Sequence, residues 1–328
     1  MSVFRHLLSF FGFLLICAAT QGASAQLVTT LLPSEFTPDE YLYTLKIGGV
    51  ERNYLVHPPE DYDELEPLPL VIFLHGAGGN ALQSARTLGW EEKADKERFV
   101  VAFPNGAPAD PSKPASFKKN PRIWEDGSFR SAMRTRKLDD TEFIKAVLID
   151  LQKRYSIDRR RIYLVGFSNG GGMTFRLAAE IGDQIAAFAC VSSLSWLPQP
   201  APKIPLPLLY LLGTRDPLTP LNGGRIRSPW GTYETKPPVL DTVEKWLRWN
   251  LCSPTPTEQK DQKGVRTVLY SPRGREGAEV RFSLVTGMGH HYPGATETLA
   301  ASIAGKPADK INGTEIIWNF LKRFRLKK

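Results

Sequence analysis

The chain has 328 residues, of which 42% are hydrophobic and 23% charged, and its formal net charge is +8. This hydrophobic content is ample for a packed core, and the length fits one large α/β unit better than a small module. No segment beyond the N-terminus approaches the ~20 apolar residues that a membrane-spanning helix needs, so we expect no membrane partner.

The first 25 residues have the layout of a secretory signal. Arg5 precedes an apolar stretch over 7–19, and the segment 23–25 (Ala-Ser-Ala) has the small residues of a cleavage site. Cleavage there would leave a single α/β domain over 26–328 and lower the formal charge from +8 to +7 by removing Arg5. The sequence therefore predicts a secreted or periplasmic protein.

Two cysteines, Cys190 and Cys252, remain once Cys17 leaves with the signal. An oxidising compartment permits one disulfide between them. Two buried free thiols are equally compatible with the sequence, because it gives no distance between the two residues. Both interpretations stay open.

The C-terminal segment 322–328 holds much of the positive charge. A nucleic-acid-binding tail needs interleaved aromatic residues, and Phe324 is the one aromatic residue in this segment. We interpret the segment as a solvated helix end and expect no nucleic-acid partner.

Short apolar runs alternate with helical patterns along the chain, which is typical of βαβ units around a mostly parallel sheet flanked by helices on both faces. Strands are expected at 41–47, 51–57, 70–74, 99–103, 162–165, 185–192, 206–212, 266–270 and 280–285. Helices are expected from Asp139 to just before Tyr155, and at 171–180, 241–251 and 314–324. The first two strands should form an antiparallel pair joined at two glycines.

The connection 104–137 is long for an α/β protein and is rich in Pro, Lys, Arg and Ser. Ordered connections of this length are often functional, so we expect a surface loop near the site.

The acidic pair Asp139-Asp140 that follows could act in acid/base chemistry, but a helix cap explains it with fewer assumptions. The segment 312–314 (Asn-Gly-Thr) is likewise interpreted as a cap rather than a glycosylation site.

The segment 166–170 reads Gly-Phe-Ser-Asn-Gly between an apolar strand and a helix-compatible stretch. This is the strand–turn–helix setting of a nucleophile elbow. Ser168 is therefore the candidate nucleophile. A serine hydroxyl reacts only when a base removes its proton and donors stabilise the oxyanion, so the chain must supply both.

The base is found by elimination among five histidines. His6 leaves with the signal, His57 precedes two prolines at a strand end, and His75 begins a glycine-rich turn where its expected role is structural. His290 and His291 lie in a loop after the last strand, where glycine and proline set a tight path. His290 is preferred over His291 because the preceding Gly-Met-Gly lets the backbone approach the serine.

The acid that orients the histidine should follow a strand between the serine and the histidine in the chain. Asp216 ends the apolar run 206–212 in a turn before Pro217. The alternative is an ordinary turn carboxylate paired with Arg215. The order serine, acid, histidine favours the catalytic interpretation.

Oxyanion donors are expected from two backbone amides. The turn 75–80 (His-Gly-Ala-Gly-Gly-Asn) follows a buried strand, and its small residues let N–H groups point above the elbow. We expect the amides of Ala77 and Asn169 to serve.

These segments together resemble the α/β-hydrolase fold and, within it, the secreted esterases grouped as polyhydroxybutyrate depolymerase-like and feruloyl or acetylxylan esterases. The resembling segments extend over most of the chain after the signal: 74–79, 139–144, 161–171, 213–217 and 287–294. The resemblance implies a serine esterase that hydrolyses feruloyl, acetyl or hydroxyalkanoate esters through Ser168, His290 and Asp216, with an acyl-enzyme and without a cofactor or metal. Family members often carry tryptophan where Tyr292 stands, so an indole-specific contact is not expected there.

The substrate expected from this resemblance is a small-molecule, oligomeric or polysaccharide-linked ester. Trp124, Trp230 and Tyr292 are candidate aromatic walls for it, although tryptophans in loops often serve as packing anchors. Two alternatives remain: a secreted serine peptidase that uses the same three residues, and a catalytically silent binding protein on the same fold. The oligomeric state is unknown.

Overall fold

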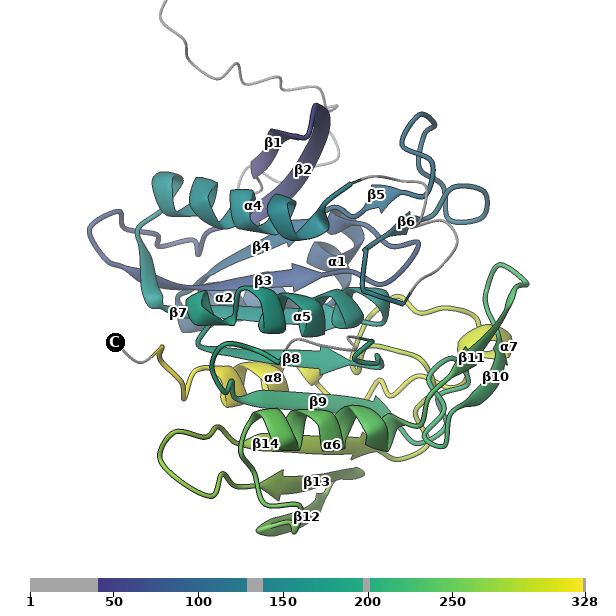
Figure 1. The fold of residues 1–328 in the computed structure, drawn as a ribbon. Coiled ribbons are helices and arrows are strands. Elements are labelled where there is room, and N and C mark those ends of the chain that lie inside the picture. The colour runs from purple at the N-terminus through teal and green to yellow at the C-terminus, as the bar shows by residue number, and fades with distance from the viewer. Residues whose placement is uncertain (1–40, 129–137, 197–200, 327–328) are drawn as a thin grey trace, which may run out of the picture.

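The structure is a computed structural model that describes residues 41–128, 138–196 and 201–326. The expected signal 1–25 lies outside these residues. The described part has three layers, with a central sheet between two sets of helices (Figure 1). Within it, no helix combines the length and apolarity needed to cross a membrane.

The central sheet has ten strands among the described residues. In spatial order they are β1 (Tyr41–Ile47), β2 (Val50–His57), β4 (Val100–Pro104), β3 (Leu68–Leu74), β7 (Ile157–Phe167), β8 (Ala187–Val191), β9 (Leu208–Gly213), β14 (Val280–Val285), β13 (Val265–Tyr270) and β12 (Glu258–Gln262). Strands β4 to β14 in this order run parallel, and the pairs beyond them are antiparallel. The predicted fold class is thereby confirmed.

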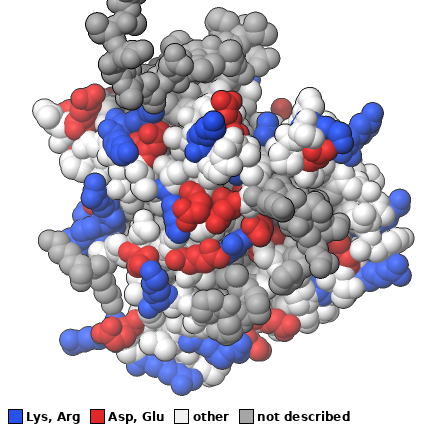
Figure 2. Space-filling view, turned by 45° about the horizontal axis from the view of Figure 1, so that its top comes forward, with Lys and Arg blue, Asp and Glu red and all other residues white. Residues whose placement is uncertain are grey.

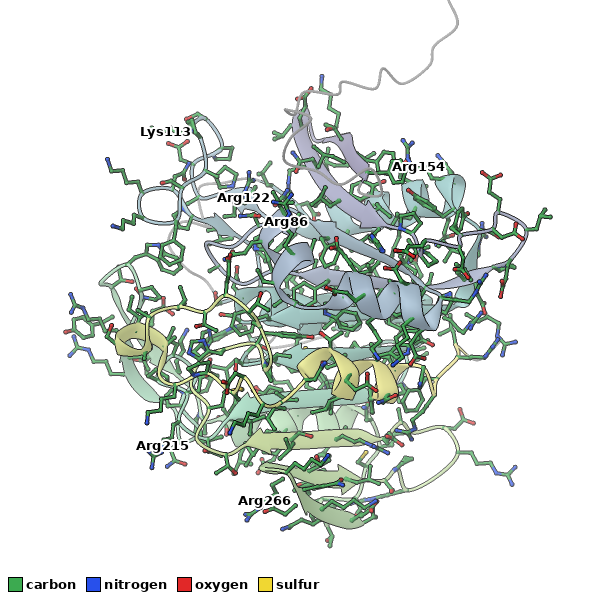
Figure 3. All side chains as sticks on the ribbon, turned by 180° about the vertical axis from the view of Figure 1, so that it is seen from behind. Arg86, Lys113, Arg122, Arg154, Arg215 and Arg266 are labelled. Atoms are coloured by element: carbon green, nitrogen blue, oxygen red, sulfur yellow. The ribbon has the colours of Figure 1, made fainter. Side chains whose placement is uncertain are left out.

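Helices cover both faces of the sheet. One face carries α4 (Asp140–Arg154), α5 (Asn169–Glu180) and α6 (Val239–Trp249), seen in front of the sheet in Figure 1. The other carries α1 (Ala81–Thr87), α2 (Trp90–Glu97) and α8 (Gly313–Leu321), with α8 in front in the view from behind (Figure 3). This is why the parallel strands read as continuous apolar runs: both of their faces are buried.

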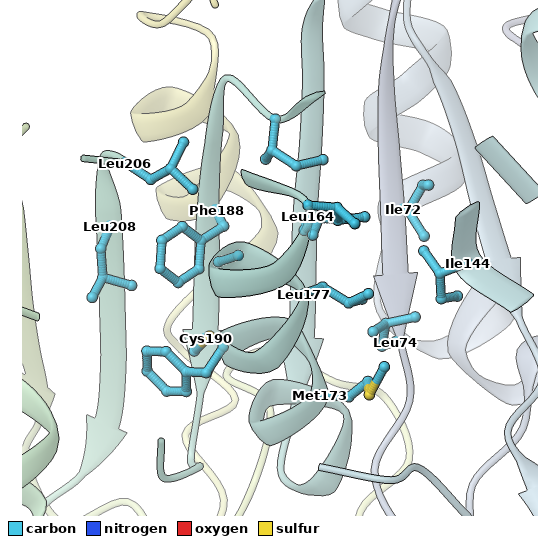
Figure 4. Packing of buried hydrophobic residues seen from close by; sticks show 14 of the residues in the cluster. Ile72, Leu74, Ile144, Leu164, Met173, Leu177, Phe188, Cys190, Leu206 and Leu208 are labelled. Atoms are coloured by element: carbon cyan, nitrogen blue, oxygen red, sulfur yellow. The ribbon is translucent and has the colours of Figure 1, made fainter. Parts of the chain in front are cut away.

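The side chains of strand β3 contribute to two hydrophobic cores, one on each face of the sheet. All seven residues are buried, and successive side chains point to opposite faces. Ile72 and Leu74 pack with α4 and α5, whereas Phe73 packs with α1, α2 and α8. Figure 4 shows the first of these cores, where Met173 and Leu177 of α5 lie over the strands.

The smaller elements gather where the parallel strands end. They are the hairpin β10 (Gly224–Arg227) and β11 (Tyr233–Lys236), the pair β5 (Ala107–Pro108) and β6 (Arg122–Ile123), and the short helix α7 (Ala301–Ala304). A 3₁₀ turn at Gly182–Gln184 instead follows α5 and precedes the start of β8. In Figure 1 the hairpin, the β5–β6 pair and α7 lie beside the arrowheads of β3, β8 and β9. The carboxyl edge of the sheet is where ligands bind in open α/β folds.

Both cap predictions are confirmed. The side chain of Asp139 accepts a hydrogen bond from the amide of Glu142, and that of Asn312 accepts one from Glu315. Asp140 has a different role, because its buried carboxylate pairs with Arg52 at 2.9 Å and accepts the amide of Glu125.

The two cysteines are buried free thiols in the structure. Burial raises the pKa of Cys190 well above its ordinary value and that of Cys252 to about 11.

Basic and acidic side chains are interspersed on the face drawn in Figure 2, despite the net charge of +8.

Candidate active site

The elbow is a sharp turn between β7 and α5. Ser168 has φ 55° and ψ −121°, a conformation that is rare for a residue with a side chain. The turn closes only because its neighbours are glycines: a Cβ at Gly166 would overlap the carbonyl of Gly170, and one at Gly170 would overlap the carbonyl of Leu74. The amide of Ser168 is held by the carbonyl of Val191 on β8 at 2.8 Å.

The structure brings Ser168, His290 and Asp216 together. The hydroxyl of Ser168 lies 2.7 Å from Nε2 of His290, and Nδ1 of His290 lies 2.9 and 3.0 Å from the two oxygens of Asp216. A carboxylate only accepts, so Nδ1–H donates to Asp216 and Nε2 is left to accept the Ser168 hydroxyl. This is the tautomer in which an imidazole can take a serine proton.

Asp216 is buried, and its environment keeps it ionised. Burial by itself raises the pKa of this carboxyl, but attraction to His290, the hydrogen bond with it and the amides of Thr219 and Leu218 together hold the pKa below its ordinary value. Oδ1 accepts those amides at 2.7 and 2.9 Å. The alternative of a turn carboxylate paired with Arg215 is not what the structure shows.

His291 points to a different partner. Its Nε2 lies 2.9 Å from the carbonyl of Gly305, and burial lowers its pKa. His290 alone of the pair reaches both Ser168 and Asp216.

His75 has the expected structural role. The amide of Gly106 donates to its Nε2 at 2.9 Å, and Nδ1–H donates to the carbonyl of Gly76 at 2.7 Å. Both nitrogens are thereby committed to the neutral ring, and burial lowers the pKa to about 4. The ring ties the turn after β3 to the loop after β4.

The turn carrying Ala77 lies beside the nucleophile. Ala77 and Gly76 line the same cavities as His290, and Gly76 packs against Ser168 and Phe167. The amide of Gly79 donates to the carbonyl of Gly76 within the turn, and the amide of Gly78 donates to the carbonyl of Arg122 on β6.

Asn169 fastens the elbow to the loop after β6. Its side chain accepts the amide of Trp124 at 2.7 Å and donates to the carbonyl of Trp124 and the carboxylate of Asp126. These bonds occupy the carboxamide, so the backbone amide is the part of Asn169 that could face an oxyanion.

The prediction that Trp124 forms a wall of the substrate site is wrong. Its side chain is fully buried and its indole N–H donates to the carbonyl of His75 at 2.9 Å. Tyr292 is also buried, with its hydroxyl paired to Thr314, although the residue does border a cavity. Trp230 is half-buried and lines the cavity that contains Ser168.

Two cavities meet at the candidate triad. The larger has a volume of about 210 Å³ and the smaller about 80 Å³. Residues that sequence reasoning missed line the smaller one; they are Phe117, Phe167, Trp196, Ile226, Leu218 and Lys236. Their positions depend on how loops distant in the sequence fold together, and only the length of the connection 104–137 hinted at Phe117.

In the described part of the chain, no cluster of three or more His, Cys, Asp or Glu side chains could hold a metal ion.

The sequence also matches a known family. Residues 62–229, which include the elbow and Asp216, match the phospholipase/carboxylesterase family. The chain belongs to this family of α/β-hydrolases. It is thus a carboxylesterase-type hydrolase.

Relatives of this carboxylesterase-type chain are named as esterases. It is 27% identical over 294 residues to "Putative esterase NocK" of Nocardia uniformis subsp. tsuyamanensis, covering 84% of this chain and 80% of that protein. It is 25% identical to feruloyl esterase B of Piromyces equi, covering 73% of this chain but only 42% of that longer protein. Acetyl xylan esterase from Aspergillus awamori shares the fold with a TM-score of 0.54 at 12% identity, over 79% of this chain and 95% of that one.

Proposed function

We propose that this hydrolase is a secreted or periplasmic serine esterase that cleaves carboxylic esters with Ser168 as nucleophile, His290 as base and Asp216 as the residue that orients His290. The observation that carries the proposal is the continuous hydrogen-bond chain from Ser168 through His290 to Asp216. The signal-like segment 1–25 supports export.

The chemistry proceeds in two halves. His290 takes the Ser168 proton as the oxygen attacks the ester carbonyl, and ionised Asp216 stabilises the imidazolium that results. His290 then gives the proton to the leaving alcohol, which leaves an acyl-enzyme on Ser168. Water, activated by His290, releases the acid. The amides of Ala77 and Asn169 stabilise the oxyanion in each half.

The lining of the smaller cavity favours an aromatic acyl group among the expected esters. Phe117, Phe167, Trp196 and Trp230 border it, together with the aliphatic side chains of Leu194, Leu218 and Ile226. Flat rings that stack on aromatic side chains gain more here than an acetyl group does. A feruloyl-type ester is therefore our preferred substrate over acetyl and hydroxyalkanoate esters.

The test compares wild type with Ser168→Ala on p-nitrophenyl acetate, methyl ferulate, acetylated xylan, hydroxybutyrate oligomers and a peptide amide. We expect wild type to hydrolyse the esters, methyl ferulate with the highest kcat/KM, and the variant to lose this activity while its circular dichroism stays unchanged. Full activity in Ser168→Ala would refute the assignment of the nucleophile. Preferred cleavage of the peptide amide would refute the esterase assignment.

A further inference from the structure

The two cavities differ in which residues of the candidate triad line them. His290 lines both cavities, whereas Ser168 lines only the smaller one and His291 only the larger one. In an acyl-enzyme the acyl carbon is bonded to the serine oxygen, so the acyl group must begin in the cavity that contains Ser168. The leaving alcohol needs only to reach Nε2 of His290. An acyl group that fills the smaller cavity leaves the larger one, which His290 also lines, for the alcohol.

One aromatic pair stands at the boundary. The indole N–H of Trp230 donates to the carbonyl of Phe117 at 2.6 Å, and the two rings lie 5.7 Å apart between centroids, tilted by 41°. Phe117 borders both cavities, while Trp230 borders the smaller one alone. The two residues are 113 positions apart in the chain and come from the β5–β6 loop and the β10–β11 hairpin.

Each loop is braced from within. Buried Asn120 accepts the amide of Asp110 and donates to three carbonyls of the β5–β6 loop. The hairpin turn is closed by Ser228 and Thr232, whose hydroxyls lie 2.7 Å apart and whose backbones also bond. In Figure 3, Lys113 marks the β5–β6 loop on the same side of the molecule as Arg215, which follows β9. The aromatic pair is therefore carried by two loops that are each held by internal hydrogen bonds.

The turn 75–80 after β3 leaves room for the two rings at Gly78. Gly78 has φ +81°, and a Cβ there would lie 2.6 Å from the Phe117 ring and 3.4 Å from the Trp230 ring. The rings therefore rest directly on the backbone next to Ala77.

We propose that Phe117 and Trp230 form a cross-loop clasp that sets substrate specificity by separating the acyl subsite from the alcohol subsite. The proposal rests on the esterase function proposed above. Trp230 limits the size of the acyl group, because it borders only the smaller cavity. Phe117 limits the size of both the acyl group and the alcohol, because its ring lies between the two cavities.

The test measures kcat/KM for two ester series with purified full-length protein. In one series the alcohol is always p-nitrophenol and the acyl group grows from acetyl to hexanoyl. In the other the acyl group is always acetyl and the alcohol grows from phenol to 2-naphthol. The variants are Trp230→Ala, Trp230→Phe and Phe117→Ala. The control is Tyr233→Ala, which removes an exposed aromatic ring from the same hairpin that borders neither cavity.

We expect Trp230→Ala to raise the hexanoyl-to-acetyl ratio of kcat/KM at least ten-fold and to leave the naphthyl-to-phenyl ratio within two-fold. Phe117→Ala should change both ratios, Trp230→Phe should change the acyl ratio less than Trp230→Ala, and Tyr233→Ala should change neither. Changes of equal size in both series for Trp230→Ala, or no change in either, would overturn the partition alone. A wild-type protein that hydrolyses no ester of either series would overturn the proposed function itself, and the partition with it.

Discussion

Two buried ionisable residues near the candidate triad, Asp216 and His75, have pKa values that respond differently to burial. Asp216 is buried yet keeps a low pKa, because His290 and two backbone amides stabilise its charge. His75 is buried with hydrogen bonds that suit only its neutral form, so the same desolvation lowers its pKa to about 4. The pKa of each group is thus set by its hydrogen-bond partners together with its burial.

Replacing Asp216 with Asn tests its orienting role. The amide can still accept the Thr219 and Leu218 bonds, but its NH₂ group would favour the wrong imidazole tautomer of His290. We expect kcat for p-nitrophenyl acetate at pH 7 to fall by about 10⁴-fold. Thermal melts control for folding, and a folded variant with wild-type kcat would contradict the role.

Titration of His75 should make the protein less stable in acid. The unfolded chain binds a proton near pH 6.5, whereas folded His75, which is fully buried and also lies near the charges of Arg122 and Arg52, binds one only near pH 4. The free energy of unfolding should therefore fall as the pH falls through this window, by about 3 kcal/mol from this group alone.

The variant His75→Gln isolates this effect. We expect it to be less stable than wild type at pH 7, where it lacks the fitted ring. Between pH 7 and pH 4 it should lose about 3 kcal/mol less than wild type in urea unfolding experiments. Equal losses in the two proteins would show that His75 does not titrate in this window.

At the scale of elements, the sequence predicted the long apolar strands and the capped helices α4 and α8. It missed α1, α2, β12 and the β10–β11 hairpin. Helix α2 is mostly charged and buries only Trp90, Lys93 and Ala94, while all of β12 is exposed. Such elements form because neighbouring elements hold them, so their own residues carry no clear periodicity.

We propose that the turn after β3 links the Phe117–Trp230 pair to the amide of Ala77, the proposed oxyanion donor, and Gly78→Ala tests this link. The left-handed φ should cost roughly 1–2 kcal/mol of stability. The new methyl group would also push against the Phe117 ring and shift the amide of Ala77. A shift of this kind should lower kcat/KM by about 100-fold.

The control is Gly274→Ala, because no atom lies within 4 Å of a Cβ there and its φ is not left-handed, so neither a clash nor backbone strain is expected. It should leave both the melting temperature and kcat/KM near the wild-type values. An equal effect of the two substitutions on kcat/KM would show that contact between the turn and the Phe117 ring does not influence catalysis.

At the scale of the whole molecule, the site was predictable because topology assembles it. Ser168, Asp216 and the His290 loop follow β7, β9 and β14, and parallel strands bring their carboxyl ends to one edge. Chain order therefore predicted that these residues meet, whereas the elbow motif chose Ser168 and elimination among the histidines chose His290. The aromatic walls were not predictable in this way, because the burial of Trp124 and the contact of Phe117 with Trp230 arise from loops packing together across the site.

The two thiols make a prediction about the folded protein as a whole. Cys190 and Cys252 lie buried in the core and are not bonded to each other. Iodoacetamide should label both only in guanidinium chloride, as mapped by peptide mass spectrometry, and dithiothreitol should leave Tm unchanged. A lower Tm after reduction would reveal a disulfide and contradict the structure.

The most direct test of the central claim is covalent labelling of the active serine by a fluorophosphonate probe, read by peptide mass spectrometry. An activated serine attacks the phosphorus of such a probe, whereas an ordinary turn serine does not. The account predicts one label on Ser168 in the folded wild type, none in Ser168→Ala and strongly reduced labelling in His290→Ala. Absence of label from Ser168 in a folded wild-type protein, or labelling of another serine in its place, would contradict it.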